Sequence, residues 1–163
     1  MNVDLFDRTT VSYEVADDLF GIQDEHPAIV TTEGDAKEWN AVVRNSSGDK
    51  ITFVPLDHQI VIKPTPSTTY SLCDCMLYRD KYWLAVVELK NQASSWIEDA
   101  ISQLKSTIDV IENCPQASVF TRREAYAANR KHPAFSYSAK SRRNDFRKKT
   151  KFRLIITNEI IVK

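Results

Sequence analysis

Glycine and cysteine are scarce in this chain, which has three of each among its 163 residues. Phosphate-cradling loops and dinucleotide fingerprints need several glycines close together, so both kinds of site are nearly excluded. An odd number of cysteines does not suggest a disulfide framework. We therefore expect a reduced, cytoplasmic protein.

Long apolar runs are also missing. No run of about 18 apolar residues occurs, so we expect no transmembrane helix and no membrane partner. The first ten residues, MNVDLFDRTT, lack the basic-then-apolar pattern of a secretory signal. The three histidines, His26, His58 and His132, are isolated, and nothing resembles a Ser-His-Asp arrangement. The length and the 42% hydrophobic content predict a single domain over 1–163 with a real core.

The formal net charge of zero conceals a strong asymmetry. Residues 1–49 contain eleven acids and three bases, whereas residues 122–153 contain twelve Lys or Arg and two acids. Aromatic residues are interspersed in the basic segment, a mixture that fits contact with nucleic-acid backbone and bases. The alternative is an ordinary solvated surface. The acidic N-terminal part could likewise contact a protein partner.

Hydrophobic periodicity predicts a mixed α/β domain. One helix is predicted over 9–20, with Thr9 or Thr10 as its N-cap, and another over 96–113, with Ser94 or Ser95 as its cap. The predicted strands are 39–44, 50–54, 59–63, 72–78, 82–90, 117–120, 152–157 and 159–162.

Three ionisable residues stand out on the central hairpin. Strands 72–78 and 82–90 are joined by a short turn near Asp80, so we expect them to be antiparallel neighbours. A bulge or a slightly shifted turn would place Asp74 beside Glu88, and Lys90 shares a strand face with Glu88. Such charges are costly to bury unless they are paired or bound to a metal.

Two adjacent carboxylates repel unless a cation lies between them, and their oxygen atoms suit Mg²⁺ or Mn²⁺. The cation would acidify a bound water for attack on a phosphodiester, and Lys90 could orient that water. The competing interpretation is an exposed Glu88–Lys90 ion pair, which stabilises a fold by at most about 1 kcal/mol. The neighbouring Cys73 and Cys75 lack further zinc ligands at a sensible spacing, so we expect core thiols.

The order of these residues resembles the PD-(D/E)xK nuclease superfamily. Asp74 is followed after thirteen residues by Glu88-Leu89-Lys90 and then by a helix that carries Gln103, and the similarity covers 60–123. The resemblance implies a restriction-endonuclease-like core, with a mixed sheet of roughly four to five strands flanked by helices. It also implies a small stand-alone, metal-dependent endonuclease that hydrolyses phosphodiester bonds in DNA.

The resemblance also implies roles for individual residues. Asp74, Glu88 and the backbone carbonyl of Leu89 would hold the metal, Lys90 would assist the water, and Gln103 would be an accessory polar group. The chain departs from the family pattern at Cys73, where the motif has proline. No acid of the first helix is identifiable; Glu14 is the first candidate and Asp18 the second.

The basic segment 122–153 would supply contacts to DNA phosphates. We expect Arg122 and Arg123 to follow the predicted strand 117–120 near the edge of the active site. The further candidates for nucleic-acid binding are Arg130, Lys131, Arg142 and Arg143. A homodimer would supply two sites for cutting both strands. The alternative function is a catalytically silent nuclease-fold protein that binds nucleic acid or a protein partner.

Overall fold

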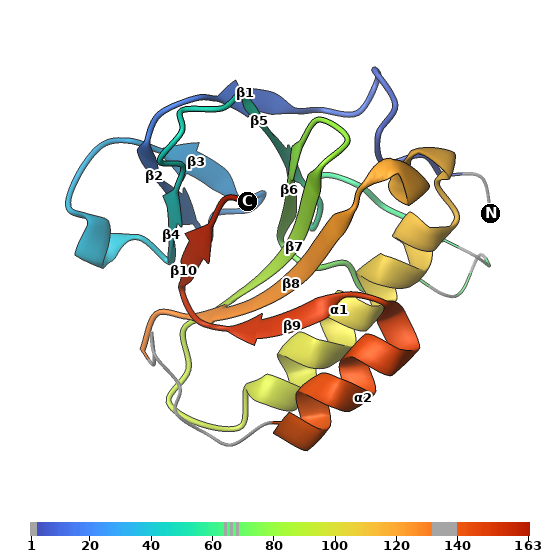
Figure 1. Ribbon diagram of the computed structural model, residues 1–163. Helices are drawn as coiled ribbons and strands as arrows, with labels where there is room; N and C mark the ends of the chain where they lie inside the picture. Colours follow the sequence, from blue (N-terminus) through green and yellow to red (C-terminus); the bar gives the residue numbers. More distant parts are fainter. Residues whose placement is uncertain (1–2, 64, 66, 68, 132–139) are drawn as a thin grey trace.

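The computed structural model describes residues 3–63, 65, 67, 69–131 and 140–163. Across these residues the chain forms two mixed β-sheets and two α-helices, so the predicted α/β class is confirmed (Figure 1). The larger sheet has six strands, in the order β1 (Tyr13–Val15), β5 (Ile51–Pro55), β6 (Cys75–Arg79), β7 (Trp83–Lys90), β8 (Arg122–Asn129) and β9 (Arg153–Ile156).

The second sheet has four strands, in the order β10 (Glu159–Ile161), β4 (Ala41–Arg44), β2 (Leu19–Gln23) and β3 (Ile29–Thr31). The helices are α1 (Ile97–Glu112) and α2 (Lys140–Thr150), and two 3₁₀ segments occur at η1 (Ala36–Glu38) and η2 (Pro115–Val119). No helix in the described part of the chain is long and apolar enough to cross a membrane.

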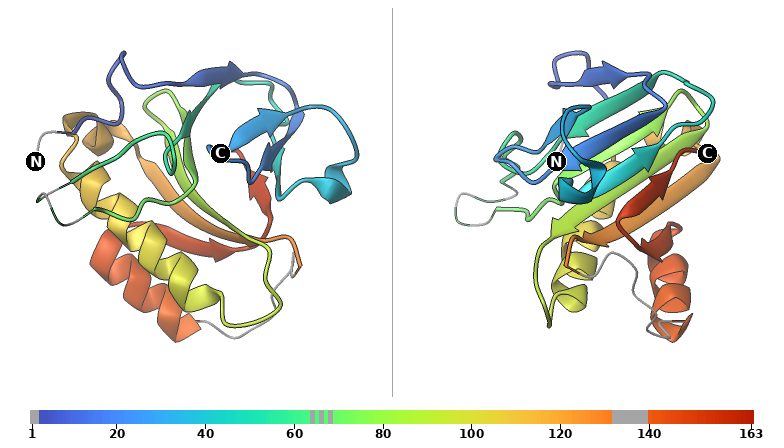
Figure 2. Two further views of the ribbon diagram at one scale, coloured as in Figure 1. Left: turned by 180° about the vertical axis from the view of Figure 1, so that it is seen from behind. Right: turned by 90° about the vertical axis from the view of Figure 1, so that its left-hand side faces the viewer.

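The molecule has three layers, with the six-stranded sheet in the middle. Helices α1 and α2 lie side by side on one face of this sheet, and the four-stranded sheet covers the other face (Figures 1 and 2). We expected one sheet of about four to five strands flanked by helices; instead, both helices lie on the same face. The second sheet arises because β4 pairs with β2 on one side and with β10 on the other, rather than with the strands that neighbour it in sequence.

Strand β7 is the centre of the fold. Its first seven residues are buried, because one face packs against the helices and the other packs against the second sheet. Leu84 and Val86 belong to the helix-side core, whereas Trp83, Ala85 and Val87 belong to the core between the sheets. A strand covered on both faces is mostly apolar, which explains the run WLAVV that precedes Glu88.

The strands β5, β6 and β7 form an antiparallel meander. Helix α1 then leads to β8, which is parallel to β7, and α2 leads to β9, which is parallel to β8. Parallel neighbours need such helical crossovers, and the apolar stripe of α1 covers the sheet beneath it. The carboxyl ends of β7, β8 and β9 therefore lie at one end of the sheet.

The predicted helix over 9–20 is wrong. This segment instead contains β1, which pairs with β5, and the start of β2. Val11 and Leu19, two of the apolar residues whose spacing suggested the helix, are exposed. Strand pairing with distant segments outweighs the local helical spacing, and Val15 and Phe20 are buried from β1 and β2 instead.

Two predicted strands are also wrong. Residues 59–63 contain no strand, and Ile60 and Ile62 pack on the helix-side core from a loop. Residues 117–120 lie in η2 and its C-cap, so the strand after α1 begins only at Arg122. Later in the basic segment the chain forms α2, a helix that was not predicted.

The helix over 96–113 is confirmed as α1, but its predicted caps are wrong. Ser95 has a positive φ of 59°, and the N-cap is Trp96, which makes no side-chain capping hydrogen bond. The left-handed backbone at Ser95 turns the chain into the helix and removes its hydroxyl from a capping position.

Candidate active site

Asp74 and Glu88 lie opposite each other by strand register. The β6–β7 ladder pairs Cys75 with Val87, and one further step brings Asp74 to Glu88. The turn is centred on Lys81, one residue later than predicted, with a φ of 57° there. This shifted turn aligns the two acids without a bulge.

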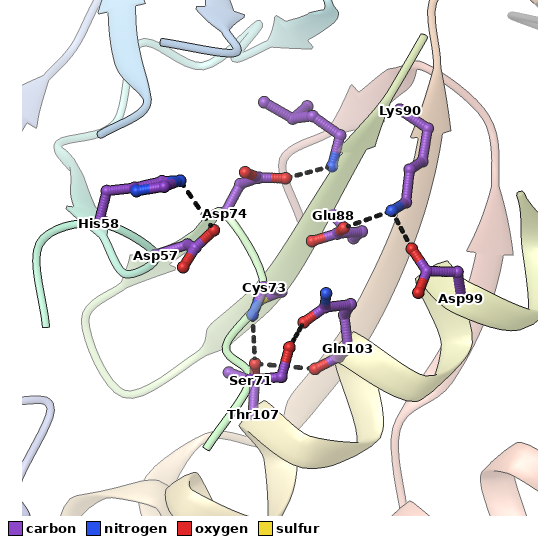
Figure 3. Close-up of polar contacts among 11 residues, drawn as sticks. Asp57, His58, Ser71, Cys73, Asp74, Glu88, Lys90, Asp99, Gln103 and Thr107 are labelled. Atoms are coloured by element: carbon purple, nitrogen blue, oxygen red, sulfur yellow. Dashed lines mark hydrogen bonds and ion pairs between the residues drawn. The ribbon is translucent and has the colours of Figure 1, made fainter. Parts of the chain in front are cut away.

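Leu89 ties Asp74 to β7. The Leu89 N–H donates to Asp74 Oδ2 over 2.7 Å, because the chain leaves the ladder just before β6 and frees this edge of β7 (Figure 3). The N–H and C=O of one strand residue point to the same side. The Leu89 carbonyl therefore faces the edge where Asp74 lies, as the resemblance requires of a ligand.

Lys90 completes the group from the same strand face as Glu88. Its Nζ lies 3.2 Å from Glu88 Oε2 and also forms an ion pair with Asp99 at the start of α1 (Figure 3). Its side chain is only 12% exposed, against 59% for Asp99. The helix thus fixes the ammonium beside the two buried carboxyl groups.

Burial dominates the electrostatics of the pair. Burial, followed by the charge of Asp74, raises the pKa of Glu88 to about 9. Burial raises the pKa of Asp74 to about 6, although the Leu89 N–H bond acts in the opposite direction. Burial lowers the pKa of Lys90, but the Asp99 hydrogen bond and the charge of Glu88 outweigh it and leave the pKa raised. At neutral pH the carboxyl pair therefore keeps one proton, and the ammonium balances its single negative charge.

A divalent cation is chemically suited to replace that proton. Asp74, Glu88 and the Leu89 carbonyl offer oxygen donors only, which suits Mg²⁺ or Mn²⁺ with water completing the shell. Among the described residues, no three His, Cys, Asp or Glu side chains are grouped so as to hold a metal ion. The donor set would thus consist of two carboxylates and one backbone carbonyl.

Gln103 lies at the edge of this site. Its Oε1 accepts a hydrogen bond from the Ser71 hydroxyl, and its amide nitrogen is turned toward the side on which Glu88 lies (Figure 3). Thr107, one turn further along α1, accepts the Cys73 N–H over 2.7 Å. These bonds hold the segment that leads into Asp74 against α1.

Several acids around the site were missed by the sequence analysis. Asp24 comes directly after β2, and Asp57 lies in the loop that follows β5. The charges of both acids raise the pKa of Asp74. The His58 ring stacks on His26 at 4.3 Å and pairs with Asp57 at 3.3 Å. Only the tertiary structure brings these loops together, although the chain's many N-terminal acids were a signal. His132 lies outside the described residues.

The candidates for a first-helix acid are wrong. Glu14 lies on β1, where it is exposed, faces Thr52 in the ladder and pairs with Lys50 at 3.8 Å. Asp18 is exposed between β1 and β2, and its carbonyl accepts the Asn45 N–H. No α-helix precedes the meander in the described chain, so neither acid has the scaffold that the family pattern requires.

The basic candidates divide between the two ends of the sheet. Arg122 and Arg123 begin β8 beside Trp83 and Leu84, so the expectation that they lie near the active site is wrong. The error follows from η2, which replaces the predicted strand and moves both arginines to the start of the next one.

The other basic candidates lie nearer the carboxylates. The Arg130 N–H donates to the Lys90 carbonyl over 3.0 Å, and Arg130 and Lys131 are both exposed. Arg142 on α2 pairs with Glu98 in the first turn of α1. Arg143 follows on α2 and lines a cavity with β9.

No family model, curated protein or solved structure matches this chain. Function is therefore inferred from the site itself.

Proposed function

We propose that this protein is a metal-dependent nuclease of the PD-(D/E)xK type that hydrolyses phosphodiester bonds in DNA. The observation that carries the proposal is the register of β6 and β7, which sets Asp74 opposite Glu88 with Lys90 on the same face. The order of meander, helix and parallel strand around these residues supports it, because the resemblance implies such a core.

The residues would divide the work as follows. Asp74, Glu88 and the Leu89 carbonyl would hold Mg²⁺ or Mn²⁺, which supplies an acidified water and charge stabilisation when bound. Lys90 would orient the attacking water or neutralise the developing negative charge. Asp99 would keep the Lys90 ammonium in place, and Gln103 would position the segment before Asp74.

The test compares wild type with Lys90→Ala on plasmid and single-stranded DNA, in Mg²⁺, in Mn²⁺ and in EDTA. We expect metal-dependent cutting that falls about 100-fold or more in the variant, because a preorganised charge at the reacting centre is lost. Lys50→Ala is the matched control, since Lys50 is exposed and makes only a 3.8 Å pair with Glu14.

Circular dichroism should verify that both variants are folded. Cutting that survives Lys90→Ala would remove this lysine from the mechanism. Absence of cutting by folded wild type that still binds DNA would favour the catalytically silent alternative. Absence of both activities would direct the search to a protein partner.

A further inference from the structure

A basic cavity lies at the end of the six-stranded sheet opposite the carboxylates. It has a volume of about 480 Å³, and its wall includes Arg122 and Arg123 of β8, Arg147 of α2, Lys151, and Arg153 of β9. Glu124 is the one acid in the wall. Five cations from β8, α2, the α2–β9 connection and β9 thus line one hollow.

Four of these cations have no acidic partner within the described chain. Arg123 pairs with Glu112 at 3.5 Å, but no ion pair involves Arg122, Arg147, Lys151 or Arg153 there. Glu124 is 1% exposed, and it accepts the Trp83 indole N–H over 2.7 Å and lies 3.7 Å from Lys163 Nζ. That carboxylate is therefore engaged inside the protein.

Stabilisation of α2 does not account for this arrangement. Cations near a helix C-terminus do favour the helix, and Arg147, Lys148 and Lys149 lie in the last turn of α2. Arg122 and Arg153 belong to strands, however, and like charges that converge from different elements repel. An anion in the cavity would relieve that repulsion.

Lys151 offers a second, independent observation. Its φ is +67°, a left-handed conformation that glycine adopts at helix C-termini without strain. A lysine there is disfavoured by the backbone, yet its side chain lines the cavity. A charge is thus placed in the cavity at a conformational cost.

The cavity continues along the edge of the molecule. A neighbouring hollow of about 360 Å³ shares Arg147 and Arg153 with it and extends to Arg143 and Asn144. A second hollow, of about 520 Å³, shares Arg147 and Lys151 and adds Lys148. A row of cationic hollows suits repeated phosphates better than one compact anion.

We infer that this cavity binds backbone phosphates of the nucleic acid at a distance from the carboxylate site. The nucleic-acid identity of the ligand rests on the proposed function, whereas the preference for phosphate rests on the cavity alone. Arg122 and Asn129 begin and end β8, so seven steps of about 3.3 Å separate the two ends by about 23 Å. At about 3.4 Å per base pair, this distance corresponds to about 7 base pairs of duplex.

The test measures binding of a labelled duplex of about 16 base pairs by fluorescence anisotropy, in EDTA and over a salt series. The variant is Arg147→Gln with Lys151→Gly, in which the glycine suits the positive φ and should preserve the fold. Lys149→Gln is the matched control, because Lys149 lies on the same helix but pairs with Asp145 and does not line the cavity. Tripolyphosphate serves as a competitor.

We expect the double variant to bind the duplex about tenfold or more weakly than wild type. The slope of the logarithm of the binding constant against the logarithm of the salt concentration should become less steep by about two. The control should remain within about twofold. Equal losses in both variants would indicate diffuse surface charge and overturn the inference, and so would no loss in either.

Two further outcomes separate this inference from the proposed function. The same binding pattern in a wild type that never cuts DNA would support the cavity and refute only the nuclease. If wild type binds tripolyphosphate through these residues but not DNA, a small phosphate ligand replaces nucleic acid and the inference fails.

Discussion

The two ends of strands β7 and β8 carry different ionisable groups, buried carboxyl groups at one end and exposed arginines at the other. At the carboxyl end of β7, Glu88 and Asp74 are buried, and Glu88 lies 3.2 Å from the Lys90 ammonium. At the amino end of β8, Arg122 and its neighbours are open to solvent around a cavity. The difference follows from depth, because buried carboxyl groups need a cation or a proton to offset their charge, whereas phosphate contacts work at the surface.

Each end also has one buried glutamate, and this sharpens the comparison. The pKa of Glu88 is raised, and its carboxyl group lies beside another acid. Glu124 instead accepts hydrogen bonds from the Trp83 indole and from the Tyr126 hydroxyl. Both hydrogen bonds go to Glu124 Oε1, whereas Oε2 is buried without a hydrogen bond in the described chain and lies 3.7 Å from Lys163 Nζ. Glu88, by contrast, needs a cation or a proton to offset the negative charge that it would carry beside Asp74. The predictions that follow test whether these two glutamates differ in role.

The largest effect is expected for Glu88→Gln. Metal-dependent cutting should fall about 100-fold or more, because the amide is a poor ligand for Mg²⁺. Stability in EDTA should change little, because Glu88, with its pKa raised to about 9, is already neutral at pH 7. Cleavage rates and urea unfolding would measure both effects.

Glu124→Gln is the matched control for this variant, and we expect it to cut DNA at the wild-type rate. A large loss of cutting in Glu124→Gln would break the distinction between the two ends. A Glu88→Gln enzyme that cuts DNA at the wild-type rate would also contradict this distinction.

A smaller effect, on stability, is expected for Trp83→Phe. The substitution leaves buried Glu124 without the 2.7 Å indole donor and removes part of a buried ring, which should lower the free energy of unfolding by about 1–3 kcal/mol. Trp39→Phe should cost less, because the Trp39 indole donates to the carbonyl of the exposed Glu33. Chemical denaturation measures both variants, and equal losses would contradict the buried role of Glu124.

A further effect on stability is expected from pH in the absence of metal. Carboxyl groups with raised pKa bind protons more tightly in the folded state, so they stabilise the fold at low pH. This contribution should be lost as pH rises through about 6 for Asp74 and about 9 for Glu88. We expect the free energy of unfolding in EDTA to fall by at least about 1 kcal/mol between pH 5 and pH 9.

In the same titration, Glu88→Gln should flatten the pH dependence, and saturating Mg²⁺ should reverse it in wild type. A wild-type stability that rises over this range in EDTA would show that the pair is ionised without a cation.

The local sequence pattern was sufficient to predict those elements whose contacts lie near in sequence. The β6–β7 hairpin and α1 follow from alternation, a short turn and helical spacing, and they bring Asp74, Glu88 and Lys90 together. Gln103 was likewise placed on α1, within reach of the segment before Asp74. These predictions needed only the periodicity of one strand pair and one helix.

The tertiary structure alone decided what lies around that centre. Residues 9–20 became strands because β1 pairs with β5 and β2 pairs with β4, contacts that no local window contains. Asp24 and Asp57 approach Asp74 through those pairings, and η2 delays β8 so that Arg122 begins it at the opposite end. Sequence determined the chemistry on the hairpin through local spacing, whereas long-range strand pairing determined which charges surround it.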